Sequence, residues 1–111
     1  MKALAELKCV PCRGEMPALT ASEVAALLPA IPAWQVVKVA DIPRLERTFS
    51  FKDFAAALAF VNQVGVLAEA EDHHPSICLT WGQVKVQWWT YVIEGLHRND
   101  FIMAAKTDLL V

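Results

Sequence analysis

The residues best suited to chemistry in this sequence are two adjacent histidines, His73 and His74, which stand between Glu69 and Pro75 in the run Glu-x-x-x-His-His-Pro. An imidazole titrates near pH ~6.5 and can donate or accept a proton near neutrality. Neighbouring side chains of an extended loop point in different directions, so both rings cannot be buried easily. The pair predicts a proton-transfer or ligand pocket. Metal binding is an alternative, although no recognised ligand spacing is present, and an exposed polar loop is another.

A second feature is the aromatic group Trp81, Trp88, Trp89 and Tyr91. Such residues usually form a core or a subunit interface, and they can also stack on a flat heterocycle or anchor another protein. Two consecutive residues of a strand face opposite sides of the sheet. Either Trp88 or Trp89 must therefore lie outside the layer between sheet and helices, which predicts a second buried surface and hence oligomerisation.

A third feature is Cys9-x-x-Cys12. Two thiols supply half of a tetrahedral zinc site or form a redox pair. No second pair completes a zinc site within the chain, although another subunit could contribute one. With Cys78 the cysteines number three, which does not indicate a disulfide framework. We therefore expect no metal.

The elements that must position these groups follow from capping and periodicity. Capping boxes at Thr20–Glu23 and Ser50–Asp53 open two helices, the second reaching about Ala70. Alternating patterns predict one hairpin over 34–39 and 45–51 with a proline turn, a second over 76–80 and 84–91, and a last helix over 100–110. The predicted fold is α+β: an α-β-β-α-β-β-α two-layer domain whose four-stranded antiparallel sheet carries the helices on one face. Residues 1–19 form an irregular N-terminal arm, and residues 20–111 form the domain.

Composition excludes several classes of function. The chain has 111 residues, 56% of them hydrophobic, and a formal charge of −2, so it is long and apolar enough for one domain with a core. It has no excess of positive charge for nucleic acid or anionic lipid. No signal-like start or unbroken apolar run of about eighteen residues is present. We expect a cytoplasmic protein that binds neither nucleic acid nor membrane.

From about Leu19 onward the sequence resembles the pterin-4a-carbinolamine dehydratase family. The family pattern has an acidic residue, His-His-Pro, an aromatic residue, a third His or Trp, and an Asp at fixed spacings. Glu69, His73, His74, Pro75, Trp81 and Asp100 all fall in register. Residues 8–14 resemble the arm of a bacterial branch of the family.

The resemblance implies the family fold and the dehydration of a 4a-hydroxytetrahydropterin to the quinonoid dihydropterin, without metal or organic cofactor. It implies catalytic roles for His73, His74, position 91 and Asp100, with His73 as the proton carrier. Substrate-binding roles fall on Glu69, Asp72, Pro75 and Trp81. The partners it implies are further copies of the chain, as a dimer or a dimer of dimers.

Tyr91 stands where the family has His or Trp. A phenol has a pKa of ~10 and makes a poor base at neutral pH. The absence of the third His or Trp predicts a weakly catalytic or non-catalytic relative, such as a Rubisco assembly factor of the bacterial α-carboxysome, with Rubisco subunits as partners. The alternatives are an active dehydratase that uses His73 and His74, and a protein that retains pterin for sensing or storage. A smaller departure is His97, where Thr or Ser would commonly cap the last helix.

Overall fold

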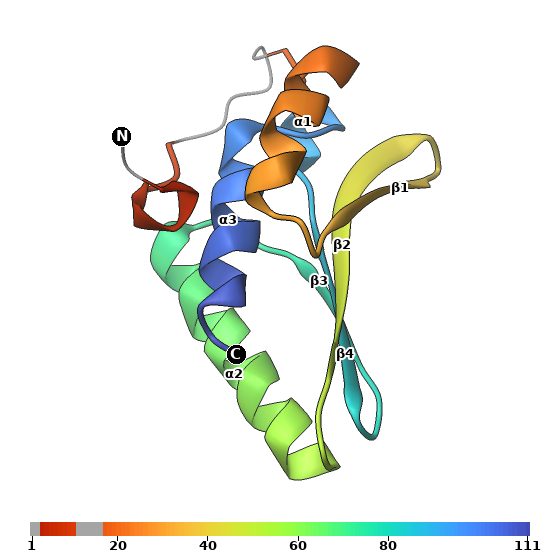
Figure 1. Cartoon of the computed structure of the whole chain (residues 1–111), viewed down its shortest axis with the longest axis vertical. Helices are drawn as coiled ribbons and strands as arrows, with labels where there is room; N and C mark the ends of the chain where they lie inside the picture. Colours follow the sequence, from red (N-terminus) through yellow and green to blue (C-terminus); the bar gives the residue numbers. More distant parts are fainter. Residues whose placement is uncertain (1–2, 11–16) are drawn as a thin grey trace.

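The computed structural model describes residues 3–10 and 17–111. In the described residues, three α-helices lie on one face of a four-stranded antiparallel sheet of order β1-β2-β4-β3 (Figure 1). The elements are α1 (Ala21–Leu27), β1 (Gln35–Val39), β2 (Ile42–Ser50), α2 (Phe54–Glu71), β3 (Ser76–Leu79), β4 (Gln83–Trp88) and α3 (Arg98–Asp108), with 3-10 turns η1 (Leu4–Glu6), η2 (Leu28–Ala30) and η3 (Tyr91–Ile93). The predicted α+β class, element order and one-sided layering are confirmed.

The core lies between the inner face of the sheet and the helices. Val84, Val86 and Trp88 of β4 are fully buried at alternate positions, as the strand period requires. On the helix side α2 buries Phe60 and Val64 at helical spacing. This helix has the length and mean hydropathy of a membrane-spanning segment, but one of its faces packs on the sheet as a core helix does.

Two local expectations need correction. Ser50 ends β2, and Asp53 alone caps α2 by accepting the Ala56 N–H at 2.8 Å, so the second capping box is wrong. The first hairpin turns at Ala40–Asp41, both with positive φ, and not at Pro43. Pro43 lies within β2, before pairing with β4 begins at Leu45, so its missing N–H breaks no bond on that side.

Trp89 corrects the inference of a second buried surface. Trp88 faces the core and Trp89 the opposite side, yet Trp89 is only 4% exposed in the single chain. The guanidinium of Arg44 lies 3.7 Å from the centre of its ring, and the Tyr91 ring packs against it with centroids 4.8 Å apart. Burial of Trp89 therefore needs no second subunit.

The N-terminal arm, predicted to be irregular, contains η1 and lies beside α3 (Figure 1). Lys106 of α3 donates from Nζ to the carbonyl oxygen of Ala5 at 2.8 Å. Of the Cys9-x-x-Cys12 pair, Cys12 lies outside the described residues. Within residues 3–10 and 17–111, no group of three or more His, Cys, Asp or Glu side chains is arranged to hold a metal.

Candidate active site

The way α2 ends gives the two histidines that follow it different surroundings. Asp72 adopts the left-handed conformation, and its N–H and that of His73 bond back to the carbonyls of Glu69 and Ala68. This Schellman-type termination stops the helix and reverses the chain direction. His73 consequently points inward and is buried, whereas His74 stays exposed and makes a 2.9 Å contact from Nε2 to the Glu69 carboxylate.

His73 is bound to a fully buried carboxylate. Its Nε2 lies 2.6 Å from Oδ1 of Asp100, which is 0% exposed. The His73 ring stacks at 12° on the indole of Trp88. A carboxylate accepts and does not donate, so Nε2–H of His73 is the donor of this hydrogen bond and Oδ1 of Asp100 is the acceptor. Nδ1 is then the ring nitrogen that can accept a proton from a ligand.

Asp100 serves α3 and His73 at once. Its Oδ2 accepts from the Thr90 hydroxyl at 2.9 Å and from the His97 N–H at 2.8 Å, the latter as half of a capping box. Donors on both oxygens satisfy a carboxylate that would otherwise be buried at a large cost in free energy. Asp100 therefore has a fixed position from which it orients the imidazole of His73.

His97 is the N-cap of α3. Its Nδ1 accepts the Asn99 N–H at 3.0 Å, a bond that requires this nitrogen to be unprotonated. Burial lowers the pKa of His97 below the usual 6.5; the Asp100 carboxylate opposes this shift, and His73 adds to it. The neutral imidazole is thus the form that fits the cap.

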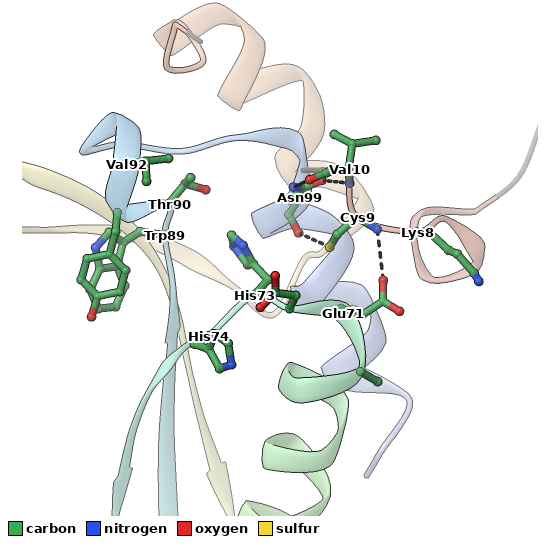
Figure 2. A pocket seen from close by; sticks show the side chains of 13 residues that line it. Lys8, Cys9, Val10, Glu71, His73, His74, Trp89, Thr90, Val92 and Asn99 are labelled. Atoms are coloured by element: carbon green, nitrogen blue, oxygen red, sulfur yellow. Dashed lines mark hydrogen bonds between the residues drawn. The ribbon is translucent and has the colours of Figure 1, made fainter. Parts of the chain in front are cut away.

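His73 lines a cavity of about 580 Å³ at the end of α2, bordered also by the segment that follows β4, the first turn of α3 and the arm. Figure 2 shows Trp89 and Val92 on one side, Cys9 and Val10 of the arm on the other, and His73 between them. The volume falls in the range of small-molecule sites. Aromatic and aliphatic walls beside an oriented imidazole suit a flat ring that exchanges a proton.

The structure brings most of the predicted site residues together. Asp72, His73, His74 and Tyr91 line the cavity, and Asp100 lies behind His73. Pro75 follows the histidines and Glu69 contacts His74, although neither is among the lining residues. Tyr91 is 66% exposed.

Trp81 is a correction, because it does not line this cavity. It is 68% exposed in the turn between β3 and β4, where the Phe51 N–H donates to the Gly82 carbonyl. That turn lies near the start of α2, whereas His73 follows its end, and an 18-residue helix is ~27 Å long. Trp81 is therefore not part of the site we propose.

Sequence reasoning missed three contributors: Thr90, Asn99 and the arm residues Cys9–Val10. Thr90 and Asn99 are 2% exposed, and each uses its side chain in a bond between segments distant in sequence. The only signal in the sequence was that Thr90 and Asn99 are polar and stand next to predicted site residues. No pattern of neighbouring residues indicated which groups they would contact.

Fold and site together define a pterin dehydratase-like protein: helices on one face of a four-stranded sheet, with a histidine–carboxylate pair in a pocket at its end. The family model for pterin 4 alpha carbinolamine dehydratase matches residues 17–110, and the chain belongs to this family.

Curated relatives agree over almost the whole chain. A Gloeobacter violaceus protein provisionally named pterin-4-alpha-carbinolamine dehydratase 1 is 54% identical to this chain over 107 residues. The match covers 96% of this chain and 92% of the relative. The Syntrophotalea carbinolica protein provisionally named pterin-4-alpha-carbinolamine dehydratase is 53% identical over 111 residues, covering 100% and 99%.

Solved structures similar to this chain include the following two. A transcriptional coactivator/pterin dehydratase from Brucella melitensis has a TM-score of 0.75 at 35% identity, covering 84% of this chain and 97% of that one. A pterin dehydratase-like protein described as a RuBisCO assembly factor in the alpha-carboxysome has a TM-score of 0.60 at 24% identity, covering 70% and 88%. The second likeness establishes a shared fold.

Proposed function

We propose that this protein is a 4a-hydroxytetrahydropterin dehydratase in which His73 moves the proton. The observation that carries the proposal is the 2.6 Å bond between His73 Nε2 and the buried Asp100 carboxylate at the wall of the cavity. Relatives of the same provisional activity at more than half identity support it. The orientation of an imidazole by a buried acid is how proteins prepare a general base.

The reaction loses water from a carbinolamine, so one proton leaves a ring nitrogen, the C–O bond breaks, and one proton joins the departing hydroxyl. Nδ1 of His73 accepts the first proton, and the Asp100 carboxylate stabilises the imidazolium that forms. His74 is the second imidazole that lines the cavity, and in this proposal it supplies the proton for the hydroxyl. Tyr91, at the rim, offers a hydrogen-bond donor but a poor base, so we expect a slow enzyme.

The test is the dehydration rate of chemically generated 4a-hydroxytetrahydropterin with purified protein, compared with buffer and with a His73→Ala variant. A rate well above buffer that disappears in the variant supports the dehydratase. A rate equal to buffer overturns it.

The assembly-factor role is the second candidate. Tyr91 in place of a third catalytic residue favours it, as does the apolar outer side of α2, where Phe54, Leu58 and Val66 are exposed. Co-purification with Rubisco subunits tests this role. It is done in a strain in which the genes next to the gene of this protein are known. Under either function we propose a cytoplasmic protein, associated with carboxysomes only in the second case.

Self-association, as a dimer or a dimer of dimers, is also proposed. The same three α2 side chains form an apolar surface, and a shallow hollow lined by Asn62, Gln63, Val66, Leu67 and Leu110 adjoins it. Apolar surface of this kind is commonly covered by another subunit.

A further inference from the structure

The arm segment Lys8–Val10 forms one side of the candidate active site, although it precedes the region matched by the family model. In Figure 2 Cys9 and Val10 lie across the cavity from Trp89 and Val92, with His73 between the two sides. Without this segment the cavity would have no lining from the arm. The arm therefore supplies one side of a cavity that the rest of the domain leaves more open.

One side chain holds this segment by both backbone groups of a single residue. The Val10 N–H donates to Oδ1 of Asn99 at 3.1 Å, and Nδ2 of Asn99 donates to the Val10 carbonyl at 2.7 Å. The amide thus imitates the pairing of a neighbouring strand. Next to it, the Cys9 N–H donates to Glu71 at the end of α2, at 3.1 Å (Figure 2).

Asn99 also fixes where the arm lies relative to His73. It is 2% exposed and immediately precedes Asp100 in the first turn of α3. The wall and the carboxylate that orients His73 are therefore held by adjacent residues of one helical turn. If the arm left, the buried amide of Asn99 would lose its partners on Val10, which favours the closed arrangement.

We propose that Asn99 is a positioning residue that holds Lys8–Val10 as a wall of the pterin pocket. The flat ring is then bound between this wall and the aromatic side formed by Trp89 and Tyr91, while His73 exchanges the proton. Asn99 acts through the arm, so its loss weakens binding and leaves the chemical step intact. The pterin part of this inference rests on the proposed function; the wall itself does not.

The test uses the full chain and two variants that break the contact from opposite sides. Asn99→Leu removes the amide but keeps the backbone N–H that His97 caps. Val10→Pro removes the arm's donor and leaves α3 unchanged. Lys106→Met is the matched control, because it releases the arm at Ala5, outside the cavity lining.

The first readout needs no pterin: modification of His73 by diethylpyrocarbonate, located by peptide mass spectrometry, with exposed His74 as internal reference. Amide hydrogen exchange of residues 3–10 is followed in parallel. Both disrupting variants should speed arm exchange and His73 modification by about tenfold, the effect of one lost hydrogen-bond equivalent, and Lys106→Met should not speed His73 modification. An unchanged rate of His73 modification in both variants would contradict the proposal that the arm forms a wall of the cavity.

The second readout is KM against kcat for dehydration, with affinity for 7,8-dihydrobiopterin as a binding probe. Both disrupting variants should raise KM and weaken probe binding by about tenfold with kcat unchanged. A fall in kcat at constant KM overturns the positioning role. If the parent protein neither dehydrates nor binds pterin, the proposed function fails. The modification and exchange data still show whether the arm forms a wall of the cavity.

Discussion

The imidazole of His73 and the carboxylate of Asp100 lie 2.6 Å apart, although 27 positions separate them in the chain. His73 follows the left-handed end of α2, and Asp100 occupies the first turn of α3. Asp100 also accepts from the backbone of His97 and the hydroxyl of Thr90, so the carboxylate that orients His73 also stabilises the start of a helix. The position of His73 and the stability of α3 therefore depend on the same side chain.

Replacement of His73 by Gln should lower the dehydration rate by ~10²–10⁴, the usual contribution of a positioned acid–base group. His74→Gln is the comparison variant, because it removes the proposed proton donor for the hydroxyl. His74 is exposed, so water can replace it as the donor, and this variant should lose far less activity than His73→Gln. Steady-state rates of the two variants check this. A larger loss in His74→Gln than in His73→Gln would show that His74, and not His73, is the base.

Tyr91→His should raise the dehydration rate at least about tenfold, because an imidazole replaces a phenol at the rim of the pocket. Tyr91→Phe separates this effect from the packing of the ring on Trp89, which it preserves. Rates measured on one pterin for all three proteins are sufficient. A Tyr91→His enzyme no faster than its parent would show that position 91 does not limit the reaction.

Thr90→Val should destabilise the fold by ~1–3 kcal/mol, because Oδ2 of the buried Asp100 loses the hydroxyl donor. Thr80→Val removes a hydroxyl bond to the Gln83 carbonyl at an exposed position and should change the free energy of unfolding little. Urea denaturation of both variants gives the comparison. Equal effects would mean that the hydroxyl of Thr90 does not matter to the buried carboxylate.

Acidification should weaken the fold through His97. Its folded-state pKa lies below the unfolded value of 6.5, so its contribution is complete above that pH. As the pH falls through 6.5 and then through the lowered folded pKa, the unfolded chain binds the proton first and this stability is lost. His97→Ser keeps a cap that does not titrate. Urea midpoints between about pH 5 and pH 8 should fall more steeply for the parent than for His97→Ser.

Val66→Glu should dissociate the assembly that we propose, because Val66 is 71% exposed and is the most exposed of the three apolar side chains on the outer side of α2. A buried, unpaired carboxylate opposes association. Val39→Glu, at the end of edge strand β1, is the companion variant. Light scattering after size exclusion gives the masses. Dissociation by Val39→Glu alone would place the interface at the sheet edge.

Local patterns were sufficient for much of this molecule. The Thr20–Glu23 capping box, the alternation of β4 and the extent of α2 each depend on residues within a few positions of one another, and the structure reproduces them. Pro43 and Ser50 show the limit of such patterns. Proline is compatible with a strand at a position that pairs with a neighbour on one side only, and a serine three residues before an acid caps a helix only if the chain has already left the sheet.

The sequence by itself determined the element order, the fold class and the run Glu69-x-x-x-His73-His74 with Asp100 in register. Tertiary structure alone decided which histidine is buried, that Trp89 is covered by Arg44 and Tyr91, and that Trp81 lies away from the pocket. It also decided that the arm meets Asn99. The physical reason is one of range: propensity and periodicity arise from neighbours along the chain, whereas the site forms where α2, β4, α3 and the arm converge.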